Sequence, residues 1–488
     1  MLGSDAQHAP TPTTLSGRTV MSTNDTSSDS RDGDSSSTKS NQSRRSRKPF
    51  VTKSNGRTYL SDATNPYPLP VDLHELHRQS LRTLLLFQLF GGPVCSPVFA
   101  QRPPTRVLEL GCGYGFWSMM THSYFSRKGH TNIKFTGIDI APLGGIAGMP
   151  NIGGAASCKP AKDRGSVSSA SGNWAEQPPD RSMNWTFVCH DLRNTPLPFD
   201  DEEFDLIMGK DMSLVVGTDH FQACMDEYLR CLKPGGVLEV WDCDHPIRML
   251  RPHVPDTPTT KTASQSFDQD PSSSGASGEP FNGGVAGNKN KGEYAKEMSE
   301  LGAYVLGNNT PLSGPQNIYL IEYNSWISKV LEQRLLLNWP CANIGPFLLQ
   351  EPLLTNHGSK RLAIPLTEVR WEREGVGGVV TKDGKSYIDT GKAVGRAKTP
   401  TPDSGTTEKK GKTLGDAQLA LRETALHTVL GMIEGLEPAL REVNEKKQDE
   451  WDAWMGKLRK ELLERDGANC GECLEVGAWW SRKVTDPS

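Results

Sequence analysis

The hydrophobic positions of the chain form short apolar runs that alternate with longer segments of helical period. Runs ended by glycines or polar residues predict five strands, at residues 106–110, 133–139, 185–190, 204–208 and 236–241. Apolar positions three and four residues apart predict a helix from Asp72 to the glycines at 91–92, and another over His220–Leu232. This alternation is typical of a mostly parallel α/β sheet with helices on both faces.

The first of these helices has clear end signals. Asp72 is a suitable N-cap with Glu75 three residues later, and Gly91-Gly92-Pro93 ends the helix. Its apolar positions are Leu73, Leu76, Leu81, Leu84, Leu85 and Leu89. We expect them to mark the face that packs on the sheet.

The second half of the chain repeats the pattern less regularly. Two further strands are predicted at 359–366 and 473–480, and helices at 326–339, 419–440 and 451–463. The helix at 326–339 leaves the end of the fifth strand, and the other two lie between the last strands, where we expect a helical cap that shapes the substrate site.

Four stretches have too few apolar residues to fold, so we predict that they are disordered. They are the N-terminal tail 1–60 and three insertions, 153–184, 252–298 and 373–413. Long insertions cost little loop-closure entropy, so one folded domain over 61–488 accommodates them. Its core is 61–251 and its C-terminal part is 299–372 and 414–488.

Composition narrows the class of protein. Only 35% of the 488 residues are hydrophobic and the net charge is −4, which argues against a general affinity for nucleic acid. No apolar run is long enough to cross a membrane, and the N-terminus lacks the apolar region of a secretory signal. With ten scattered cysteines, this favours reduced thiols in a cytoplasmic protein. The basic run 44–48 leaves a nuclear location open.

The most informative segment follows the first strand and reads Glu109-Leu110-Gly111-Cys112-Gly113-Tyr114-Gly115. Glycines at every second position let the backbone turn sharply and approach a ligand. Pyrophosphate-binding turns instead have G-x-G-x-x-G spacing. An acid just before the glycines also suits a ligand that carries an amino group. A tight turn without any ligand is the alternative.

Three later features argue against a glycine turn without a ligand. Asp139 ends the second strand, where a carboxylate can accept hydrogen bonds from ribose hydroxyls. Asp191 follows the third strand, in position for an adenine amino group. Leu232-Lys233-Pro234-Gly235-Gly236 joins a helix to the fifth strand.

In this order and spacing, these features resemble class I S-adenosylmethionine (SAM)-dependent methyltransferases, most closely over about residues 60–250. Within that class, the segment from Tyr67-Pro68-Leu69-Pro70 onward resembles fungal methyltransferase-domain proteins related to the velvet-complex regulators of secondary metabolism. The resemblance implies a Rossmann-like, seven-stranded, mostly parallel sheet whose last two strands are antiparallel. It also implies SAM as cofactor, held by Glu109, Gly111, Cys112, Gly113, Gly115, Asp139, Ile140, Asp191, Leu192, Lys210 and Asp211.

Three functions are weighed. The first is transfer of the SAM methyl group to an O, N or C atom of an unidentified acceptor, a small molecule or a protein. No catalytic acid or base stands out, and none is required. The second is a SAM-binding regulatory protein whose insertions bind protein partners. The third, a nicotinamide-dependent oxidoreductase, is disfavoured by the glycine spacing and Glu109. We predict no metal site: Cys470 and Cys473 have metal-ligand spacing but no second matching pair.

Overall fold

The computed structural model describes residues 50–141, 179–251, 287–307, 310, 312–374, 378–380, 386–388, 414–464 and 467–485. All of them belong to one compact unit that starts at Lys48. Residues 1–47 lie outside the described residues, as do most of the three predicted insertions.

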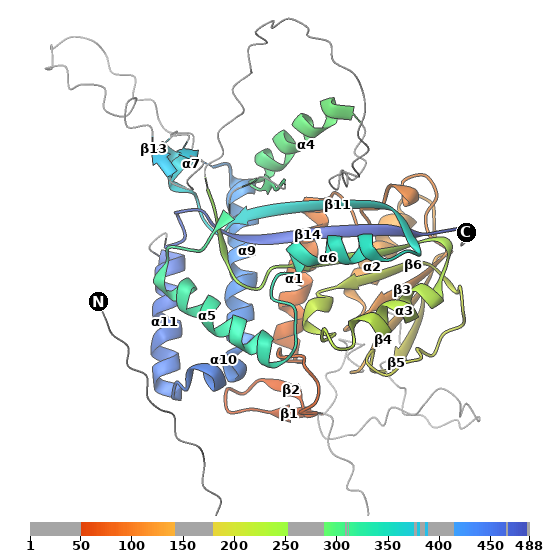
Figure 1. Ribbon diagram of the computed structural model, residues 1–488, viewed down its shortest axis with the longest axis horizontal. Helices are drawn as coiled ribbons and strands as arrows, with labels where there is room; N and C mark the ends of the chain where they lie inside the picture. Colours follow the sequence, from red (N-terminus) through yellow and green to blue (C-terminus); the bar gives the residue numbers. More distant parts are fainter. Residues whose placement is uncertain are drawn as a thin grey trace, which may run out of the picture. The chain divides into compact units, whose positions relative to one another are not determined.

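The five strands predicted in the first half form the parallel part of one sheet (Figure 1). They are β3 (Arg106–Leu110), β4 (Lys134–Asp139), β5 (Asn184–Cys189), β6 (Phe204–Lys210) and β7 (Leu232–Cys243). Their order is β5-β4-β3-β6-β7, and all neighbours are parallel. Because β3 lies between β4 and β6, the strand order reverses there. In open α/β sheets, ligands bind at the carboxyl ends of the strands at such a switch point.

The last two predicted strands complete the sheet as an antiparallel pair. They are β11 (Leu354–Pro365) and β14 (Glu472–Lys483), and β14 lies between β7 and β11, antiparallel to both. Figure 1 shows them side by side along the sheet. Three short strands extend this side: β8 (Arg248–Leu250), β9 (Tyr304–Val305) and β10 (Leu312–Ser313). Within the described residues the sheet therefore has ten strands, not the predicted seven.

Helices cover both faces of the sheet, because successive strand residues point to opposite sides. Val107, Leu206 and Val237 belong to one core cluster, and the helices that contribute to it include α1 (Leu73–Phe90), α2 (Phe116–Ser126) and α9 (Asp416–Gly435). Their neighbours Leu108, Ile207 and Leu238 belong to a second cluster, with α3 (Phe221–Cys231) and α6 (Pro340–Gln350). The mixed α/β prediction with helices on both faces is confirmed.

The other helices and strands lie around the sheet and the helices that cover its two faces. They are β1 (Phe50–Thr52), β2 (Thr58–Leu60), η1 (Pro97–Phe99), η3 (Met212–Leu214), α4 (Gly287–Leu301), α5 (Ile318–Gln333), α7 (Arg370–Glu374), β12 (Gly378–Val380), β13 (Ser386–Ile388), α10 (Glu437–Asn444) and α11 (Gln448–Glu464). The helices α9, α10 and α11 intervene between β11 and β14, as the sequence predicts.

Several predicted disordered stretches contain secondary structure at their ends. The hairpin of β1 and β2 lies inside the predicted tail 1–60, and buried Tyr59 donates a hydrogen bond to the carbonyl of Gly435 (2.8 Å). The insertion 252–298 contains most of α4, with Met298 in the core. The start of β5 falls within 153–184, and β12 and β13 fall within 373–413. The rest of these stretches lies outside the described residues.

Two helix predictions were wrong in their bounds. The helix expected at 326–339 is α5, which starts at Ile318 because Asn317 caps it through hydrogen bonds from Tyr319 N and Leu320 N. The helix expected at 419–440 breaks at Leu436, and α10 follows with a proline in its first turn.

The buried face of α1 is also different from the one predicted. Leu81 and Leu84 are exposed, while Glu75, Arg78 and Arg82 are buried. Glu75 and Arg78 pair with each other within α1 (2.6 Å), and Arg82 pairs with Asp211, as described below.

Two further observations bear on the sequence predictions. Among the described residues, no helix combines the length and apolar character needed to span a bilayer. Eight cysteines are free thiols, but Cys189 is disulfide-bonded, which differs from the expectation of reduced thiols throughout.

Candidate functional site

Strand register brings most of the predicted residues to one edge of the sheet. Leu110 pairs with Ile138 in β4 and with Gly209 in β6. The residues that follow each of these positions are Gly111, Asp139 and Lys210, so they emerge together at the switch point. Asp139 pairs with Cys189, which puts Asp191 two residues beyond the same edge.

The turn after β3 requires its glycines. Gly111, Gly113 and Gly115 have φ of +56°, +56° and +79°, a conformation that side-chain-bearing residues rarely adopt. A hydrogen bond from Cys112 N to Ile138 O (3.1 Å) joins the turn to β4. Helix α2 starts directly after Gly115.

Asp139 links this turn to the end of β4. Its carboxylate accepts hydrogen bonds from Gly113 N (2.8 Å) and Ala141 N (2.9 Å). Burial raises its pKa from 3.8 to about 6, and the two backbone donors partly oppose that rise. Each carboxylate oxygen can accept a further bond, so Asp139 can both fix the turn and bind hydroxyl groups of a ligand.

Glu109 has a structural partner that the sequence did not reveal. One carboxylate oxygen accepts hydrogen bonds from the Ser118 backbone N (3.2 Å) and hydroxyl (2.6 Å), and so caps the first turn of α2. The other oxygen lies 3.7 Å from Lys210 Nζ. Burial raises the pKa of Glu109, while Lys210 and Ser118 oppose the rise.

A pocket lies over the turn, and eight of the eleven predicted residues line it: Gly111, Gly113, Asp139, Ile140, Asp191, Leu192, Lys210 and Asp211. Glu109, Cys112 and Gly115 do not line it. Glu109 and Cys112 are buried behind the turn, and Gly115 faces Pro179 and Trp185. Binding of a ligand by these residues stays a prediction.

The sequence analysis did not identify the part of the pocket wall that comes from α1 and the segment before it. This part includes Asn65, Tyr67 and Val71 from the segment before α1, together with Leu76 and Gln79 from α1 itself. Gln79 donates a hydrogen bond to the hydroxyl of Tyr67 (3.0 Å), which connects the two parts. The Tyr67-Pro68-Leu69-Pro70 segment was the available signal, although nothing in it indicates contact with the glycine turn.

Asp191 and Asp211 already have cationic partners. Asp191 forms an ion pair with Arg193 (2.6 Å), and Asp211 forms one with buried Arg82 of α1 (2.7 Å). Asp211 has a φ of +55°, which turns the chain from β6 into η3. The pair of Arg82 and Asp211 thus fastens α1 to the edge of the pocket.

A buried polar cluster lies beside this pair. Ser213 donates a hydrogen bond to Asp242 (2.8 Å), so Nε2 of His245 (2.9 Å) is the donor to the Ser213 hydroxyl. Burial and the nearby Arg82 lower the pKa of His245 to about 3, so its ring is neutral. Burial and the Asp211 charge raise the pKa of Asp242. The cluster fixes the η3 turn against the end of β7.

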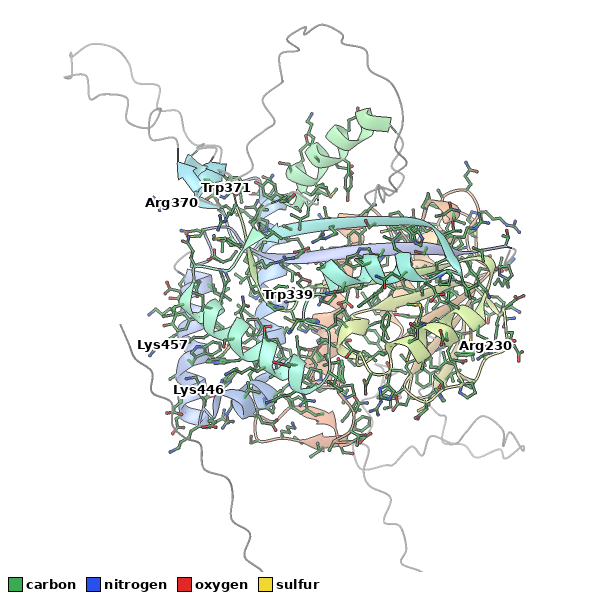
Figure 2. All side chains as sticks on the ribbon, in the orientation of Figure 1. Arg230, Trp339, Arg370, Trp371, Lys446 and Lys457 are labelled. Carbon is green, nitrogen blue, oxygen red and sulfur yellow. The ribbon has the colours of Figure 1, made fainter. Side chains whose placement is uncertain are left out.

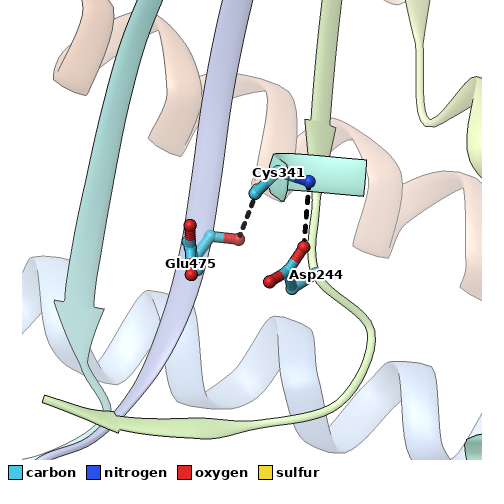
Figure 3. A group of neighbouring side chains, drawn as sticks. All are labelled: Asp244, Cys341 and Glu475. Atoms are coloured by element: carbon cyan, nitrogen blue, oxygen red, sulfur yellow. Dashed lines mark hydrogen bonds between the residues drawn. The ribbon is translucent and has the colours of Figure 1, made fainter. Parts of the chain in front are cut away.

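One group of side chains has the composition of a metal site. Asp244, Cys341 and Glu475 come from the loop after β7, the start of α6 and β14 (Figure 3). Arg248 pairs with both carboxylates, and Arg361 also pairs with Glu475. Burial raises the pKa of Cys341, so the thiol keeps its proton. With its charges balanced in this way, the group joins three elements, and Arg248 also lies over the ring of Trp339, labelled in Figure 2 (5.2 Å).

The methyltransferase-domain family model matches residues 164–236. This match runs from before β5 to the first residues of β7, and the glycine turn lies outside it.

A curated relative is the secondary metabolism regulator laeA of Aspergillus niger, which is 36% identical over 93 residues. That match covers 18% of this chain and 22% of the relative, so the two proteins are similar over about a fifth of their lengths.

Solved structures similar to this chain include the plantazolicin methyltransferase BpumL in complex with SAH, with 14% identity over 35% of this chain and 51% of that one (TM-score 0.23). The N-methyltransferase NodS from Bradyrhizobium japonicum is 18% identical over 35% of this chain and 62% of that one (TM-score 0.20). The [4+2]-cyclase SpnF is 20% identical over 36% and 62% (TM-score 0.21). Scores this low support no functional inference. Over residues 164–236 the chain is therefore similar to the methyltransferase-domain family.

Proposed function

We propose that the protein is a SAM-dependent methyltransferase and that SAM binds in the pocket over the glycine turn. The observation that carries this proposal is the meeting of the glycine turn with Asp139 and Asp191 at the switch point of the sheet. The match to a methyltransferase-domain family supports it.

The residues of the pocket fit this cofactor chemically. Asp139 offers carboxylate oxygens for two ribose hydroxyls, and Leu192 and Ile140 offer apolar surface for a flat base. The left-handed glycines let the backbone come close to the methionine portion. The carboxylate of buried Glu109, which lies behind this turn, has Lys210 Nζ 3.7 Å from its second oxygen.

When bound, SAM supplies a methyl group on a sulfonium, which is already an activated donor. The protein then needs chiefly to hold the donor and acceptor in line and to exclude water. Tyr67, Leu76 and Gln79 cover the pocket from above, and Arg82 holds α1 in place through Asp211. We infer an O, N or C nucleophile of a small molecule or protein as acceptor.

Transfer of a tritium-labelled methyl group from SAM into fractionated cell extract tests this function. The protein should label one fraction, and separation of proteins from small molecules then gives the acceptor class. Asp139→Ala should label less at the same SAM concentration. No label above a reaction without protein would contradict methyl transfer.

A second candidate is a SAM-binding regulator that transfers no methyl group. The similarity to a relative named as a secondary metabolism regulator favours it, and predicted insertions would then bind partner proteins. SAM binding in calorimetry without any labelled acceptor is the expected result for this candidate. A cytoplasmic location, or a nuclear one reached through the basic run 44–48, is compatible with both functions.

A further inference from the structure

A segment of irregular chain, residues 61–71, forms one wall of the pocket over the glycine turn, and we call it the strap. The strap residues that line the pocket are Asn65, Tyr67, Pro70 and Val71. The strap leads from β2 to Asp72, the N-cap of α1, and Val71 N donates a hydrogen bond back to Thr58 O in β2 (2.7 Å). Both ends of the strap are therefore fixed to folded elements.

Arg193 joins the middle of the strap to the sheet side of the pocket. Its guanidinium donates hydrogen bonds to Thr64 O (2.7 Å) and to the carboxylate of Asp62 (3.3 Å), both in the strap. The same guanidinium donates to both carboxylate oxygens of Asp191, the shorter bond being 2.6 Å. Asp191 lines the pocket just beyond the end of β5. One side chain thus bridges the edge of the sheet and the strap.

Arginine is suited to this bridge by its shape. The planar guanidinium carries five N–H donors in a fixed fork, so it can bond to three acceptors at once, whereas a lysine ammonium is a single point of charge. The Arg193 side chain is only 14% exposed, and hydrogen bonds from a charged donor are stronger than neutral ones. Opening the strap at Arg193 breaks two such bonds together.

Other contacts hold the strap from the helical side of the pocket. Gln79 of α1 donates to the hydroxyl of Tyr67 (3.0 Å), and Arg334, just after α5, donates to Pro66 O (3.2 Å). If Arg193 releases the strap, these two contacts still hold it on the helices, and the gap opens beside Asp191. The Asp62 side chain is 50% exposed, so this gap opens to solvent.

We propose that Arg193 is a latch that holds the strap closed over the pocket, and that SAM enters and leaves when this latch opens. The gating of SAM rests on the proposed function, because it takes SAM to be the ligand of the pocket. The closed strap itself is a property of the protein without any ligand.

Hydrogen–deuterium exchange of the full chain without SAM tests the closed strap. Arg193→Lys keeps the charge beside Asp191 but loses the fork, so the strap amides of Thr64, Asn65 and Tyr67 should exchange about threefold to tenfold faster. Arg230→Lys is the matched control. Arg230, labelled in Figure 2, joins α3 to the carbonyls of Leu197 and Phe199, and none of its hydrogen-bond partners among the described residues lies in the strap. Strap exchange should stay within about twofold of the wild type in this control.

Rapid filtration with radiolabelled SAM tests the gate. The latch is closed with and without SAM, so Arg193→Lys should raise the association and dissociation rates by the same factor, about threefold to tenfold, and leave Kd within about twofold. Loss of a direct contact with the ligand would instead raise the dissociation rate alone and weaken Kd. Arg230→Lys should leave both rates within about twofold of the wild type.

The latch is overturned if strap exchange in Arg193→Lys equals that of the wild type, or if Arg230→Lys raises it equally. The gate is overturned if the dissociation rate of Arg193→Lys rises without the association rate, or if neither rate changes. A wild type that binds no SAM would contradict both the gate and the proposed function, while the exchange measurement would still decide whether Arg193 holds the strap.

Discussion

At the scale of single residues, Asp139 has two tasks in one carboxylate. It holds Gly113 N and Ala141 N, and it offers its remaining acceptor capacity to the pocket. The sequence predicted its position because an acid ends an apolar strand. The sequence could not predict that the same carboxylate fixes the glycine turn, since that bond depends on how β3 and β4 pair.

Replacement of Asp139 by alanine removes both tasks, so the affinity and the fold are measured together. Asp139→Ala removes two charge-assisted hydrogen bonds to the ribose, and we expect SAM affinity to fall at least about tenfold while the protein still folds. Calorimetry gives the affinity and circular dichroism the fold. An unchanged affinity would show that Asp139 is not a cofactor ligand.

The raised pKa of Asp139 predicts a pH dependence. Above its pKa of about 6 the carboxylate is ionised and accepts from both hydroxyls, and below it the added proton removes acceptor capacity. SAM affinity should therefore be about tenfold weaker at pH 5 than at pH 8, one factor of ten for the unit below the pKa. Asp139→Ala should flatten this profile. The same tenfold loss in that variant would assign the titration to another group.

Glu109 shows how a predicted site residue can lie outside the lining of the pocket. Its position before the glycines indicated a ligand amino group, yet its hydrogen bonds go to Ser118 in the first turn of α2. Cys112 also does not line the pocket, and its sulfur is buried close to Gly137. The residue types were informative, but whether a side chain faces the pocket or the core depends on the local turn.

At the scale of elements, strands were easier to predict than helices. The parallel strands are short apolar runs, and all except β5 are largely buried, so their ends were visible to within a few residues. Helix α5 was misplaced although Asn317 is a good N-cap, and Pro438 marked the break before α10. Both signals are present in the sequence, but the helix bounds were predicted from the spacing of the apolar residues.

The charged face of α1 could not be predicted. Arg82 is buried because Asp211, far away in sequence, lies opposite it at the end of β6. Helical periodicity identifies an apolar face, but a buried ion pair needs both partners in place before either one is recognisable.

This pair should contribute strongly to stability. Arg82→Ala leaves Asp211 beside buried Asp242 without its cation, and we expect a loss of about 3–5 kcal/mol in the free energy of unfolding. Arg106→Ala, which breaks an exposed pair with Glu203, is the control and should cost less than about 1 kcal/mol. Urea unfolding of both variants measures the difference. Similar losses in the two variants would mean that the pair of Arg82 and Asp211 contributes no more to stability than the pair of Arg106 and Glu203.

At the scale of the whole molecule, the chain combines a folded sheet and its helices with sequence stretches that contain few apolar residues. The stretches 153–184 and 252–298 are predicted from their composition to be the first sites of proteolysis. After limited digestion the protein should still melt in one cooperative transition, because Met183 and Met298 are the only described residues of these stretches in the buried core clusters. Loss of that transition after the first cuts would show that these stretches stabilise the fold.

The central claim is that the glycine turn at the switch point of the sheet holds SAM. Gly113 lines the pocket at φ +56°, so Gly113→Val strains the turn and places a side chain against the ligand. Gly56, in the turn between β1 and β2, has φ +75° and open space around it, so Gly56→Val carries similar strain, about 1–3 kcal/mol, away from the pocket.

Calorimetric titration of SAM into the wild type and these two variants is the most direct measurement. The structure predicts one SAM per chain for the wild type and for Gly56→Val, and no measurable binding for a folded Gly113→Val. A wild-type protein that does not bind SAM, or a Gly113→Val protein that binds it as tightly as the wild type, would contradict the claim.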